Sequence, residues 1–487
     1  MKFSLNKITQ RQYPLPESLD DLNNINEFLS LHKNKKVVVV QGLGFVGAVM
    51  SIVCANALGE EYAVIGIDLP NEDSYWKIRS INEGVFPLNA DDNKISEYFE
   101  RARKKGNLYA TFDSRVFGLA DIIIVDINLD VIKKSNDLGV LRNFDVDLSS
   151  FDSAITEIGK FCREDAIILV ETTVPPGTSQ LVVKPIIDKE LLKRNMSIEN
   201  YRLGHSYERV MPGPNYIDSI ISYPRVYSGI NENSADVIES FLKTIIDTSK
   251  CDLTRLENTN ASEIAKVLEN SYRAMNISFM VEWSRFAEEA GVDLYSVIDA
   301  IRVRETHKNI MFPGIGVGGY CLTKDPLLAS WSRTSIFNSD NQLDMSIKSV
   351  SNNDQMPVFA FERLKNIYGD LKNKKIVLLG VSYRGNVGDT RYSPVEKFYN
   401  LLKKSGAVIY LHDPFISYWE EKNITVSSEL NQAIESEPDI IVISAGHDIY
   451  KNENTIEKIM NLNPLTIFDT IGHLNKEQLK LLKVKHK

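Results

Sequence analysis

The chain has 487 residues, enough for about three domains of roughly 150 residues each. Hydrophobic residues make up 43% and charged residues 25%, proportions that exclude a disordered or collagen-like chain. With 56 basic and 65 acidic side chains, the formal net charge is −9, which argues against nucleic acid or an anionic membrane surface as partner. No apolar run reaches the ~18 residues that a membrane-spanning helix needs.

The cysteines are scattered along the chain and contain no CxxC pair. They are Cys54, Cys162, Cys251 and Cys321. In a chain of this length, that spacing indicates reduced thiols in a cytoplasm, without disulfides and without a metal site. We therefore expect a cytoplasmic protein in which at most one cysteine has a chemical role.

Residues 1–34 are polar and weakly periodic, and we expect them to form an extension on the surface. Short β-branched runs then alternate with helical patterns, which predicts a parallel sheet with helices on both faces over about residues 35–230. The expected strands include Val37–Val40, Ala63–Ile67, Ile122–Val125 and Ala166–Val170.

The pattern changes at Asn258, where apolar residues recur every three or four positions to Ala290 without a proline. This predicts one long amphipathic helix, a spine that can also pair with a copy of itself. A second strand–loop–helix series begins at Lys374, with strands expected at Lys374–Leu379, Val408–Leu411, Ile440–Ser444 and Thr466–Phe468.

The predicted fold class is therefore α/β, with two Rossmann-like doubly wound domains joined by a long central helix and a helical middle domain. The expected boundaries are 1–34 for the extension, 35–230 for the first α/β domain, 231–355 for the helical and dimerisation domain, and 356–487 for the second α/β domain.

A glycine motif follows the first strand directly and leads into an apolar helix. Its residues are Gly42, Leu43, Gly44, Phe45, Val46 and Gly47. The first glycine permits a tight turn, the second lets the backbone approach a pyrophosphate, and the third lets helix and strand pack closely. Asp68 ends the second strand, where a carboxylate binds the ribose hydroxyls of NAD and repels the 2′-phosphate of NADP. The motif and Asp68 together predict NAD as the cofactor.

Two further loops carry polar or reactive groups. Thr172 and Thr173 begin a rigid Pro- and Gly-containing loop at the carboxyl end of a strand, where open α/β sheets bind ligands, although a structural turn is an equal alternative. Four glycines between Gly314 and Gly319 precede Cys321, a pattern typical of backbone pressed against a ligand. Lys324 would favour the nucleophilic thiolate and Asp325 would order a water molecule.

Other polar residues are more ambiguous. Lys266 lies one helical turn before Asn270, so both share a face of the long helix, although on these residues alone a solvated lysine is the favoured interpretation. His205, Glu208 and Arg209 precede a rigid loop that begins Met211-Pro212. Taken alone, these residues favour a structural role.

In combination, the motifs resemble the UDP-glucose/GDP-mannose dehydrogenase family of nucleotide-sugar 6-dehydrogenases. The resemblance spans about residues 35–475 and follows the family's order. Its motifs are Gly42–Gly47, Thr172–Pro175, Glu208, Lys266 with Asn270, Gly318–Asp325, Gly380–Arg384 and Gly388–Arg391.

The resemblance implies a role for each matching residue. The catalytic positions are Cys321, Lys266, Asn270, Asp325, Glu208 and Thr173. The cofactor positions are the glycine motif, Asp68, Lys77, Thr172, Lys324 and Arg391. The substrate positions are Arg209, Arg304, Phe312, Gly314, Gly316, Gly318, Tyr383 and Arg384. The resemblance further implies a UDP-sugar bound by the second α/β domain, with the sugar between the two domains, and a homodimer formed through the long helix.

Some positions depart from the family pattern. Asp126, Ile127 and Asn128 stand where a Thr-Pro-Thr-like tail is usual, and Tyr207 stands where proline is usual before Glu208. Arg304 lies one residue from the position of an arginine that reaches the partner subunit's site. The segments 208–213 and 316–319 resemble the branch acting on UDP-N-acetylhexosamines more than the UDP-glucose branch.

The implied reaction oxidises C6 of a UDP-sugar to a uronic acid with two NAD, through a thiohemiacetal and a thioester on Cys321. Two alternatives remain at this point. A two-electron dehydrogenase of the hydroxyacid type would share the first domain and the long helix, but it needs no cysteine. A non-catalytic nucleotide-sugar-binding protein would keep the glycine loops without needing Lys266, Cys321 and Asp325 together.

Overall fold

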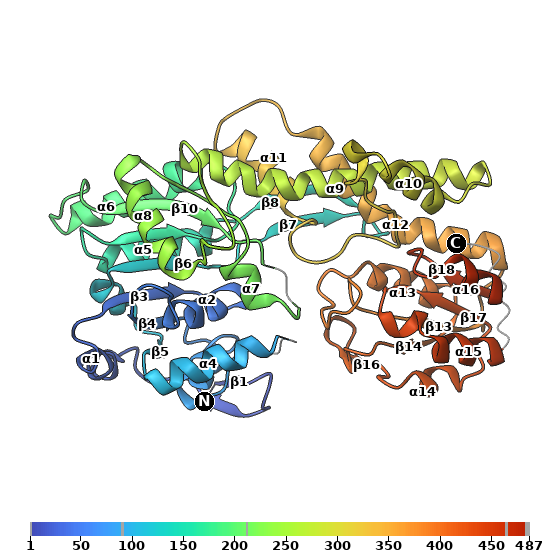
Figure 1. Ribbon diagram of the computed structural model, residues 1–487, viewed down its shortest axis with the longest axis horizontal. Helices are drawn as coiled ribbons and strands as arrows, with labels where there is room; N and C mark the ends of the chain where they lie inside the picture. The colour runs from blue at the N-terminus through green and yellow to red at the C-terminus, as the bar shows by residue number, and fades with distance from the viewer. Residues whose placement is uncertain (1, 89–91, 211–212, 463–465, 483–487) are drawn as a thin grey trace. The chain divides into compact units, whose positions relative to one another are not determined.

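The computed structural model describes residues 2–88, 92–210, 213–462 and 466–482, and the chain forms two compact units (Figure 1). Unit 1 consists of Met1–Asp130, Val146–Val267 and Ser332–Ser339. Unit 2 consists of Val131–Asp145, Leu268–Trp331 and Asp340–Lys487.

Unit 1 is built on a sheet whose strands are β3 (Lys36–Gln41), β4 (Tyr62–Ile67), β5 (Leu108–Thr111), β6 (Ile122–Val125), β9 (Ile167–Val170), β10 (Arg202–Tyr207), β11 (Arg225–Gly229) and β12 (Leu253–Arg255). Its helices are α1 (Leu22–Ser30), α2 (Phe45–Ala55), α3 (Tyr75–Glu83), α4 (Asn93–Lys105), α5 (Ser149–Phe161), α6 (Lys184–Lys193), α7 (Tyr216–Ile221) and α8 (Glu232–Ile245). The strands predicted for this part of the chain are confirmed.

The strand order is β12-β11-β10-β9-β6-β3-β4-β5, and every neighbouring pair is parallel except β10 with β11. The chain therefore winds outward from β3 to β5 and then returns to start the other half at β6. The gap between β3 and β6 is the topological switch point, where ligands bind in open α/β sheets. The sheet continues to β12, past residue 230, because β11 pairs with β12.

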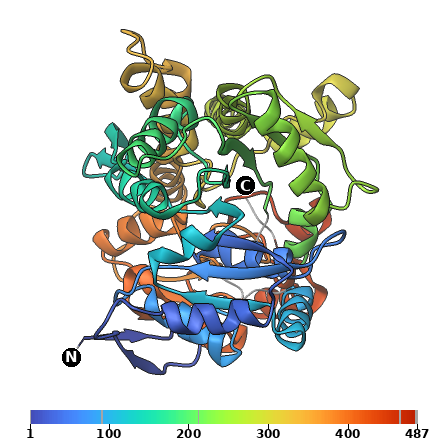
Figure 2. The ribbon, with the colours of Figure 1, turned by 90° about the vertical axis from the view of Figure 1, so that its left-hand side faces the viewer.

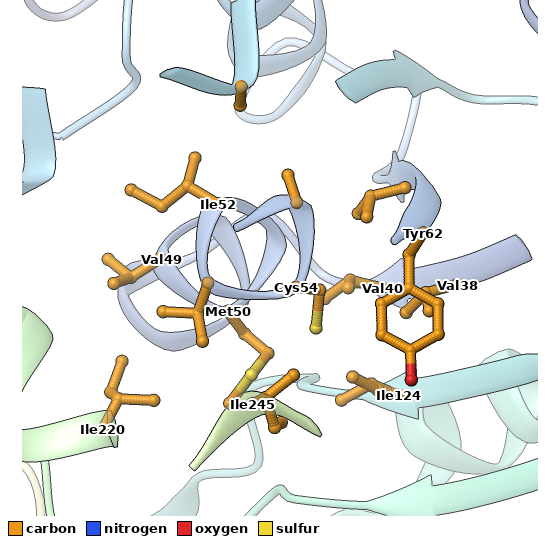
Figure 3. Packing of buried hydrophobic residues seen from close by; sticks show 14 of the residues in the cluster. Val38, Val40, Val49, Met50, Ile52, Cys54, Tyr62, Ile124, Ile220 and Ile245 are labelled. Atoms are coloured by element: carbon orange, nitrogen blue, oxygen red, sulfur yellow. The ribbon is translucent and has the colours of Figure 1, made fainter. Parts of the chain in front are cut away.

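Helices cover both faces of this sheet (Figure 2). Alternate strand residues such as Val38, Val40 and Ile124 pack against α2, α7 and α8 in one apolar cluster, and Figure 3 shows their side chains around α2. The intervening residues, including Val39 and Ile123, are also fully buried. Burial on both faces explains the continuous β-branched runs in the sequence.

Residues before β3 are more ordered than the sequence suggests. They form the antiparallel strands β1 (Phe3–Leu5) and β2 (Gln12–Pro14) and helix α1, in dark blue in Figure 2. Ser4 and Asn6 are fully buried, and Asn6 Nδ2 donates to Ser80 Oγ over 2.7 Å. Most of the described residues before β3 are nevertheless exposed, and Ser4 and Asn6 are buried by hydrogen bonds to α3 and to Glu72 before it.

Unit 2 contains the second predicted α/β fold. Its parallel sheet has the order β14-β13-β17-β18, with β13 (Lys375–Leu379), β14 (Val408–His412), β17 (Ile440–Ile443) and β18 (Thr466–Asp469). Around it lie α13 (Pro394–Lys404), β15 (Tyr418–Trp419), β16 (Ile424–Thr425), α14 (Leu430–Ile434), α15 (Glu453–Leu462) and α16 (Lys476–Leu481). Ile376 and Val377, consecutive on β13, belong to separate apolar clusters, so this sheet is also covered on both faces.

The rest of unit 2 is a hairpin and helices. The hairpin strands are β7 (Val131–Ser135) and β8 (Leu141–Val146), and the helices are α10 (Leu294–Arg302), α11 (Asp325–Ser335) and α12 (Asp344–Tyr368). The long helix predicted for 258–290 is α9 (Thr259–Glu289), which starts in unit 1 and ends in unit 2. The fold class predicted from the sequence, two doubly wound α/β sheets and a helical middle, is confirmed.

Candidate active site

The glycine motif of unit 1 has the geometry of a dinucleotide cradle. Gly42 has φ +95°, and a Cβ there would lie 2.3 Å from the carbonyl oxygen of Asp126. A Cβ on Gly47 would lie 1.8 Å from the carbonyl oxygen of Gly42, so the helix approaches the turn as closely as backbone allows. A Cβ on Gly44 would meet no atom within 4 Å, and no side chain caps α2. The N–H groups at the start of α2 therefore face open space that suits a pyrophosphate.

Asp68 stands beside this cradle, as predicted. Its Oδ2 accepts hydrogen bonds from Leu43 N over 3.1 Å and from Lys77 Nζ over 3.0 Å. The second contact joins the two residues that the family resemblance placed at the ribose. Leu43 itself is fully buried against Gly66, so its backbone faces the cradle while its side chain belongs to the core. The residues present therefore fit an NAD molecule.

Thr172 and Thr173 follow β9 at the same sheet edge. Thr172 Oγ1 accepts a hydrogen bond from Ile127 N over 2.9 Å and donates to the carbonyl of Val125 or Ile127, which ties the ends of β6 and β9 together. Thr173 is half-buried. The hydroxyl of Thr172 thus has a structural role, and Thr173 is the threonine with a partly exposed position.

Glu263 anchors the loop after Thr173, and sequence reasoning missed it. The carboxylate, fully buried on α9, accepts hydrogen bonds from Gly177 N over 2.6 Å and Ser179 N over 2.8 Å. Burial raises its pKa to about 7, although those hydrogen bonds act in the opposite direction. Glu263, Lys266 and Asn270 are spaced i, i+3, i+7 along α9, and this row of polar residues is the signal that identifies Glu263.

Lys266 is buried and contacts Glu208. Its Nζ donates to the carbonyl oxygen of Glu208 over 2.8 Å, lies 4.0 Å from Glu208 Oε1 and sits 5.2 Å from the ring centre of Tyr207. Tyr207, which replaces the usual proline, thus offers an aromatic face to the ammonium group. Arg209 donates to the carbonyl of Pro224 and also lies over Tyr207. Met211 and Pro212, from the motif that favours the N-acetylhexosamine branch, lie outside the described residues.

Cys321 differs from the other three cysteines in its environment. It is exposed, whereas Cys54, Cys162 and Cys251 are buried. Burial raises the pKa of all three buried thiols, to about 11 for Cys162 and well above the ordinary value for Cys54. The thiol that the sequence selects for chemistry is therefore the accessible one.

A buried polar cluster adjoins Cys321 within unit 2. Asp325 Oδ2 accepts a hydrogen bond from Asn270 Nδ2 over 2.7 Å, and its Oδ1 lies 3.2 Å from Lys324 Nζ. The N–H groups of Lys324 and Asp325 both donate to the carbonyl of Cys321, at 3.1 and 2.9 Å. Three of the predicted catalytic residues, Cys321, Asn270 and Asp325, are thus brought together. The ammonium group of Lys324 faces Asp325 and the ring of Tyr320, at 4.6 Å from its centre.

The glycines before Cys321 allow close packing within the chain. A Cβ on Gly318 would lie 2.5 Å from the side chain of Tyr383, and one on Gly316 would lie 2.2 Å from Pro394. Gly319 has φ +76°. The backbone at Gly316 and Gly318 is therefore packed closely against this chain's own residues, and its approach to a ligand stays a prediction. The same packing brings Tyr383 next to the cysteine loop.

The remaining predicted substrate residues are scattered within unit 2. Phe312 stacks on Tyr295, with ring centres 5.8 Å apart, whereas Arg304 and Arg384 are exposed. Arg391 forms an ion pair of 2.6 Å with Asp389. A cavity of about 710 Å³ borders Gly314 and is lined by residues of α9, α10, α12 and the end of β18. The structure brings Gly314 alone of the predicted substrate residues to this cavity.

Among the residues that the structure describes, no three His, Cys, Asp or Glu side chains lie close enough together to hold a metal ion. Within the same residues, no helix is long and apolar enough to cross a bilayer.

A parallel sheet with a cradle for a dinucleotide, a second sheet of the same kind and an exposed cysteine beside buried polar groups are the features expected of a nucleotide-binding oxidoreductase. Comparison with known sequences gives the family. The chain belongs to the UDP-glucose/GDP-mannose dehydrogenase family: the family's NAD binding domain matches residues 35–246, its central domain 260–347 and its UDP binding domain 377–476. The resemblance drawn from the motifs is confirmed, and the chain is an NAD-dependent nucleotide-sugar dehydrogenase.

Individual relatives extend this result. The chain is 29% identical to the UDP-N-acetyl-D-mannosamine dehydrogenase of Methanocaldococcus jannaschii, over 91% of this chain and 93% of the relative. It is 26% identical to the solved UDP-D-ManNAc dehydrogenase of Pyrococcus horikoshii, with a TM-score of 0.74 over 90% of this chain and 96% of that one. The solved NDP-N-acetyl-D-galactosaminuronic acid dehydrogenase of Methanosarcina mazei shares the fold, at 23% identity and a TM-score of 0.74, over 95% and 97% of the two chains.

Proposed function

We propose that this chain oxidises C6 of a UDP-N-acetylhexosamine to the UDP-uronic acid, and that it serves polysaccharide biosynthesis in the cytoplasm. Two observations favour an N-acetylated sugar over UDP-glucose. The segments around Glu208 and Gly318 resemble that branch of the family. Relatives that match over nine-tenths of the chain are named for UDP-N-acetyl-D-mannosamine, which makes this sugar the first to test.

The observation that carries the proposal is the environment of Cys321. An exposed thiol on a loop held by backbone hydrogen bonds is suited to add to an aldehyde. A two-electron dehydrogenase needs no such group. Covalent capture keeps the aldehyde bound until the second oxidation, which explains why a four-electron enzyme places a nucleophile there.

The other polar residues supply the remaining chemistry. NAD, when bound, accepts a hydride from the substrate in each of the two oxidations. Lys266, whose ammonium is buried beside Glu208, stabilises the oxyanions. Asp325, oriented by Asn270, directs a water molecule at the thioester, and Thr173 assists in positioning it. Because Lys266 and Asp325 are buried, their charges act on the reacting groups with little screening by water.

The domain roles follow the family. We assign NAD binding to the α/β domain at 35–230, dimerisation to 231–355 and the UDP part of the substrate to 356–487, with Arg209, Arg304, Tyr383 and Arg384 among the substrate contacts. The exposed apolar residues of α9 support a homodimer. Ile264, Leu268, Tyr272, Phe279, Trp283 and Phe286 are 45–60% exposed, and they recur at the spacing of one helical face.

The test is the number of NADH formed per sugar. We expect two NADH for each UDP-N-acetylmannosamine oxidised, with NADH followed by its ultraviolet absorbance and the product sugar quantified in the same sample. The same assay is run with UDP-glucose, UDP-GlcNAc, UDP-galactose and GDP-mannose. One NADH per sugar contradicts the four-electron proposal, and a higher kcat/KM for UDP-glucose contradicts the substrate.

The Cys321→Ser variant tests the nucleophile separately. We expect this variant to stall after the first oxidation or during hydrolysis. A serine hydroxyl is a weaker nucleophile toward the aldehyde than a thiolate, and a serine alkoxide is a poorer leaving group from the resulting ester. Cys251→Ser, a change at a buried thiol of unit 1, is the matched control and keeps two NADH per sugar. Full turnover by Cys321→Ser removes Cys321 from the mechanism.

A further inference from the structure

Four adjacent strands of unit 1 each present one charged side chain at the same edge of the sheet. Asp126 follows β6, Glu171 follows β9, Glu208 follows β10 and Arg225 begins β11. Val125 pairs with Val170, so Asp126 and Glu171 are in-register neighbours, and Tyr207 pairs with Val226, so Glu208 and Arg225 are in-register neighbours. Val170 pairs with His205, so Glu208 lies two residues beyond the position opposite Glu171. Because in-register neighbours, and residues two apart on one strand, point to the same face, the two pairs lie side by side on one face of the sheet, and we call this group the carboxylate row.

The carboxylate row has too few cations. Glu171 and Arg225 are 1% and 2% exposed, and Arg225 Nη1 lies 3.1 Å from Glu171 Oε1. Glu171 Oε2 and Asp126 Oδ2 are buried without a hydrogen-bond partner among the described residues. Arg225 therefore pairs with Glu171 and Lys266 approaches Glu208, so the three carboxylates of the row have two cations between them. A buried carboxylate oxygen without a hydrogen-bond partner is costly when the carboxylate is charged. Binding of a proton removes that charge, so these two oxygens favour a protonated carboxyl group.

Electrostatics agree with this geometry. The pKa of Asp126 is raised well above its ordinary value by burial, then by the charges of Glu171 and Glu208, with Arg225 opposing. Burial raises the pKa of Glu171 to about 7, again with Arg225 opposing and Glu208 assisting. Burial raises the pKa of the Cys54 thiol of α2, and the charges of Glu171 and Asp126 raise it further.

The position of the row links it to the reaction. Asp126 stands at the topological switch point, where its carbonyl packs on Gly42 of the cradle and its Cβ lies 3.1 Å from a Cβ built on Gly47. Glu208, at the other end, contacts Lys266. The carboxylate row thus runs from the cofactor cradle to a predicted catalytic lysine.

We propose that Asp126, Glu171 and Glu208 share a proton as one unit and accept the proton released when the substrate alcohol is oxidised. In that step the C6–H electron pair leaves as a hydride to the nicotinamide, the O–H electron pair becomes the second C–O bond, and the proton moves to Glu208 and then to the buried carboxylates. The inference rests on the proposed dehydrogenase function, which supplies the hydride acceptor. Asp126 and Glu171 do not touch substrate in this scheme and act through Glu208.

The free enzyme gives the first test, without cofactor or turnover. The infrared band of protonated carboxyl groups is recorded at neutral pH for the wild type and for Asp126→Asn, which keeps the shape but cannot ionise. We expect the variant to lose one protonated carboxyl. Asp165→Asn is the control, because Asp165 precedes the opposite end of β9 and forms an exposed ion pair with Arg163. An unchanged band in Asp126→Asn overturns the proposal.

A second variant keeps the test valid if Asp126→Asn fails to fold. Glu208 is partly exposed, and in Glu208→Gln Lys266 keeps its hydrogen bond to the backbone carbonyl of residue 208. Removing its negative charge should shift the titration of the Asp126 carboxyl to lower pH, because like charges raise each other's pKa. If the infrared titration of the Asp126 carboxyl is unchanged in Glu208→Gln, Glu208 does not interact with the row and the proposal is contradicted.

Turnover gives the third readout. With a pH indicator in weak buffer, we expect proton release by the wild type to lag behind NADH formation, and release by Asp126→Asn to coincide with it. Equal timing in the two enzymes contradicts proton storage. The count of NADH per sugar is measured in the same experiment, so failure of the dehydrogenase function is recognised separately from failure of the row.

Discussion

At the scale of single residues, burial separates the groups that hold the fold from those that react. Cys54 lies in the core around α2, with Met50 and Ile245 (Figure 3), and its thiol is protected by that burial. Cys321 has the opposite environment, on a loop whose glycines let it approach Tyr383. Tyr383 reflects this proximity, since its pKa is raised mainly by burial and then by charges that include Asp389 and Cys321.

Glu263 predicts a pH dependence of stability. Its pKa is about 7 in the fold against an ordinary value of 4.5, so the folded state binds more protons between these values than the unfolded state. By linkage, its contribution to stability is present below pH 4.5, falls by at most about 1.4 kcal/mol per pH unit as pH rises to 7, and is lost above that. We expect Glu263→Gln, which carries no titrating proton, to lack this part of the pH dependence.

The measurement is the melting temperature at a series of pH values from 4.5 to 8. The melting temperature of the wild type minus that of Glu263→Gln should decrease as the pH rises from 4.5 to 8. Glu257→Gln, an exposed change two residues before α9, should leave the difference constant. A pH-independent difference for Glu263→Gln shows that Glu263 is ionised throughout and contradicts the prediction.

At the scale of elements, two glycines of one motif predict opposite outcomes. Gly47→Ala places a Cβ 1.8 Å from the carbonyl oxygen of Gly42, so α2 must move away from β3 and the fold loses stability. Gly44→Ala places its Cβ in open space, and we expect an unchanged melting temperature with NAD affinity reduced by about tenfold or more. Melting curves and NAD titration by fluorescence distinguish the two variants. Equal NAD affinity in Gly44→Ala would falsify the cradle.

How far the sequence predicts these elements depends on the length of the pattern. Strands buried on both faces, such as β3 and β13, carry continuous apolar runs and were predictable. The hairpin β7–β8 and the strands β1 and β2 were not, because three to six residues with mixed polarity leave too short a period to recognise. Their burial comes from tertiary hydrogen bonds, as at Asn6.

The candidate site follows the same rule. Cys321, Lys266 and Asp325 are predicted from the sequence because ordered motifs carry them, and their roles stay predictions. Glu263 and Asp126 were not assigned roles, since each acquires its role only through partners distant in sequence, namely Gly177 for Glu263 and Glu171 for Asp126. The close packing of Gly316 on Pro394 is equally invisible in a sequence. Local patterns predict which groups are present, and tertiary contacts decide what surrounds them.

At the scale of the whole molecule, α9 has its polarity reversed relative to an ordinary surface helix. Its polar residues Glu263, Lys266 and Asn270 are buried, whereas Leu268 is 60% and Phe279 55% exposed. An apolar stripe of this kind costs free energy in water unless another surface covers it. A second copy of the same helix is the occupant that the family resemblance implies, and a two-fold pair would cover both stripes at once.

Leu268→Asp with Phe279→Asp is therefore expected to convert a dimer into a monomer, because two carboxylates would be desolvated in each half of the interface. Light scattering after size exclusion reads the mass directly, against 55.1 kDa for one chain. Leu192→Asp is the matched control, since Leu192 is 58% exposed on α6 and lies outside the stripe. If Arg304 reaches the neighbouring subunit's substrate, as the resemblance implies, the monomer also loses kcat/KM for the sugar nucleotide while it keeps NAD affinity. A double variant that remains dimeric contradicts pairing through α9.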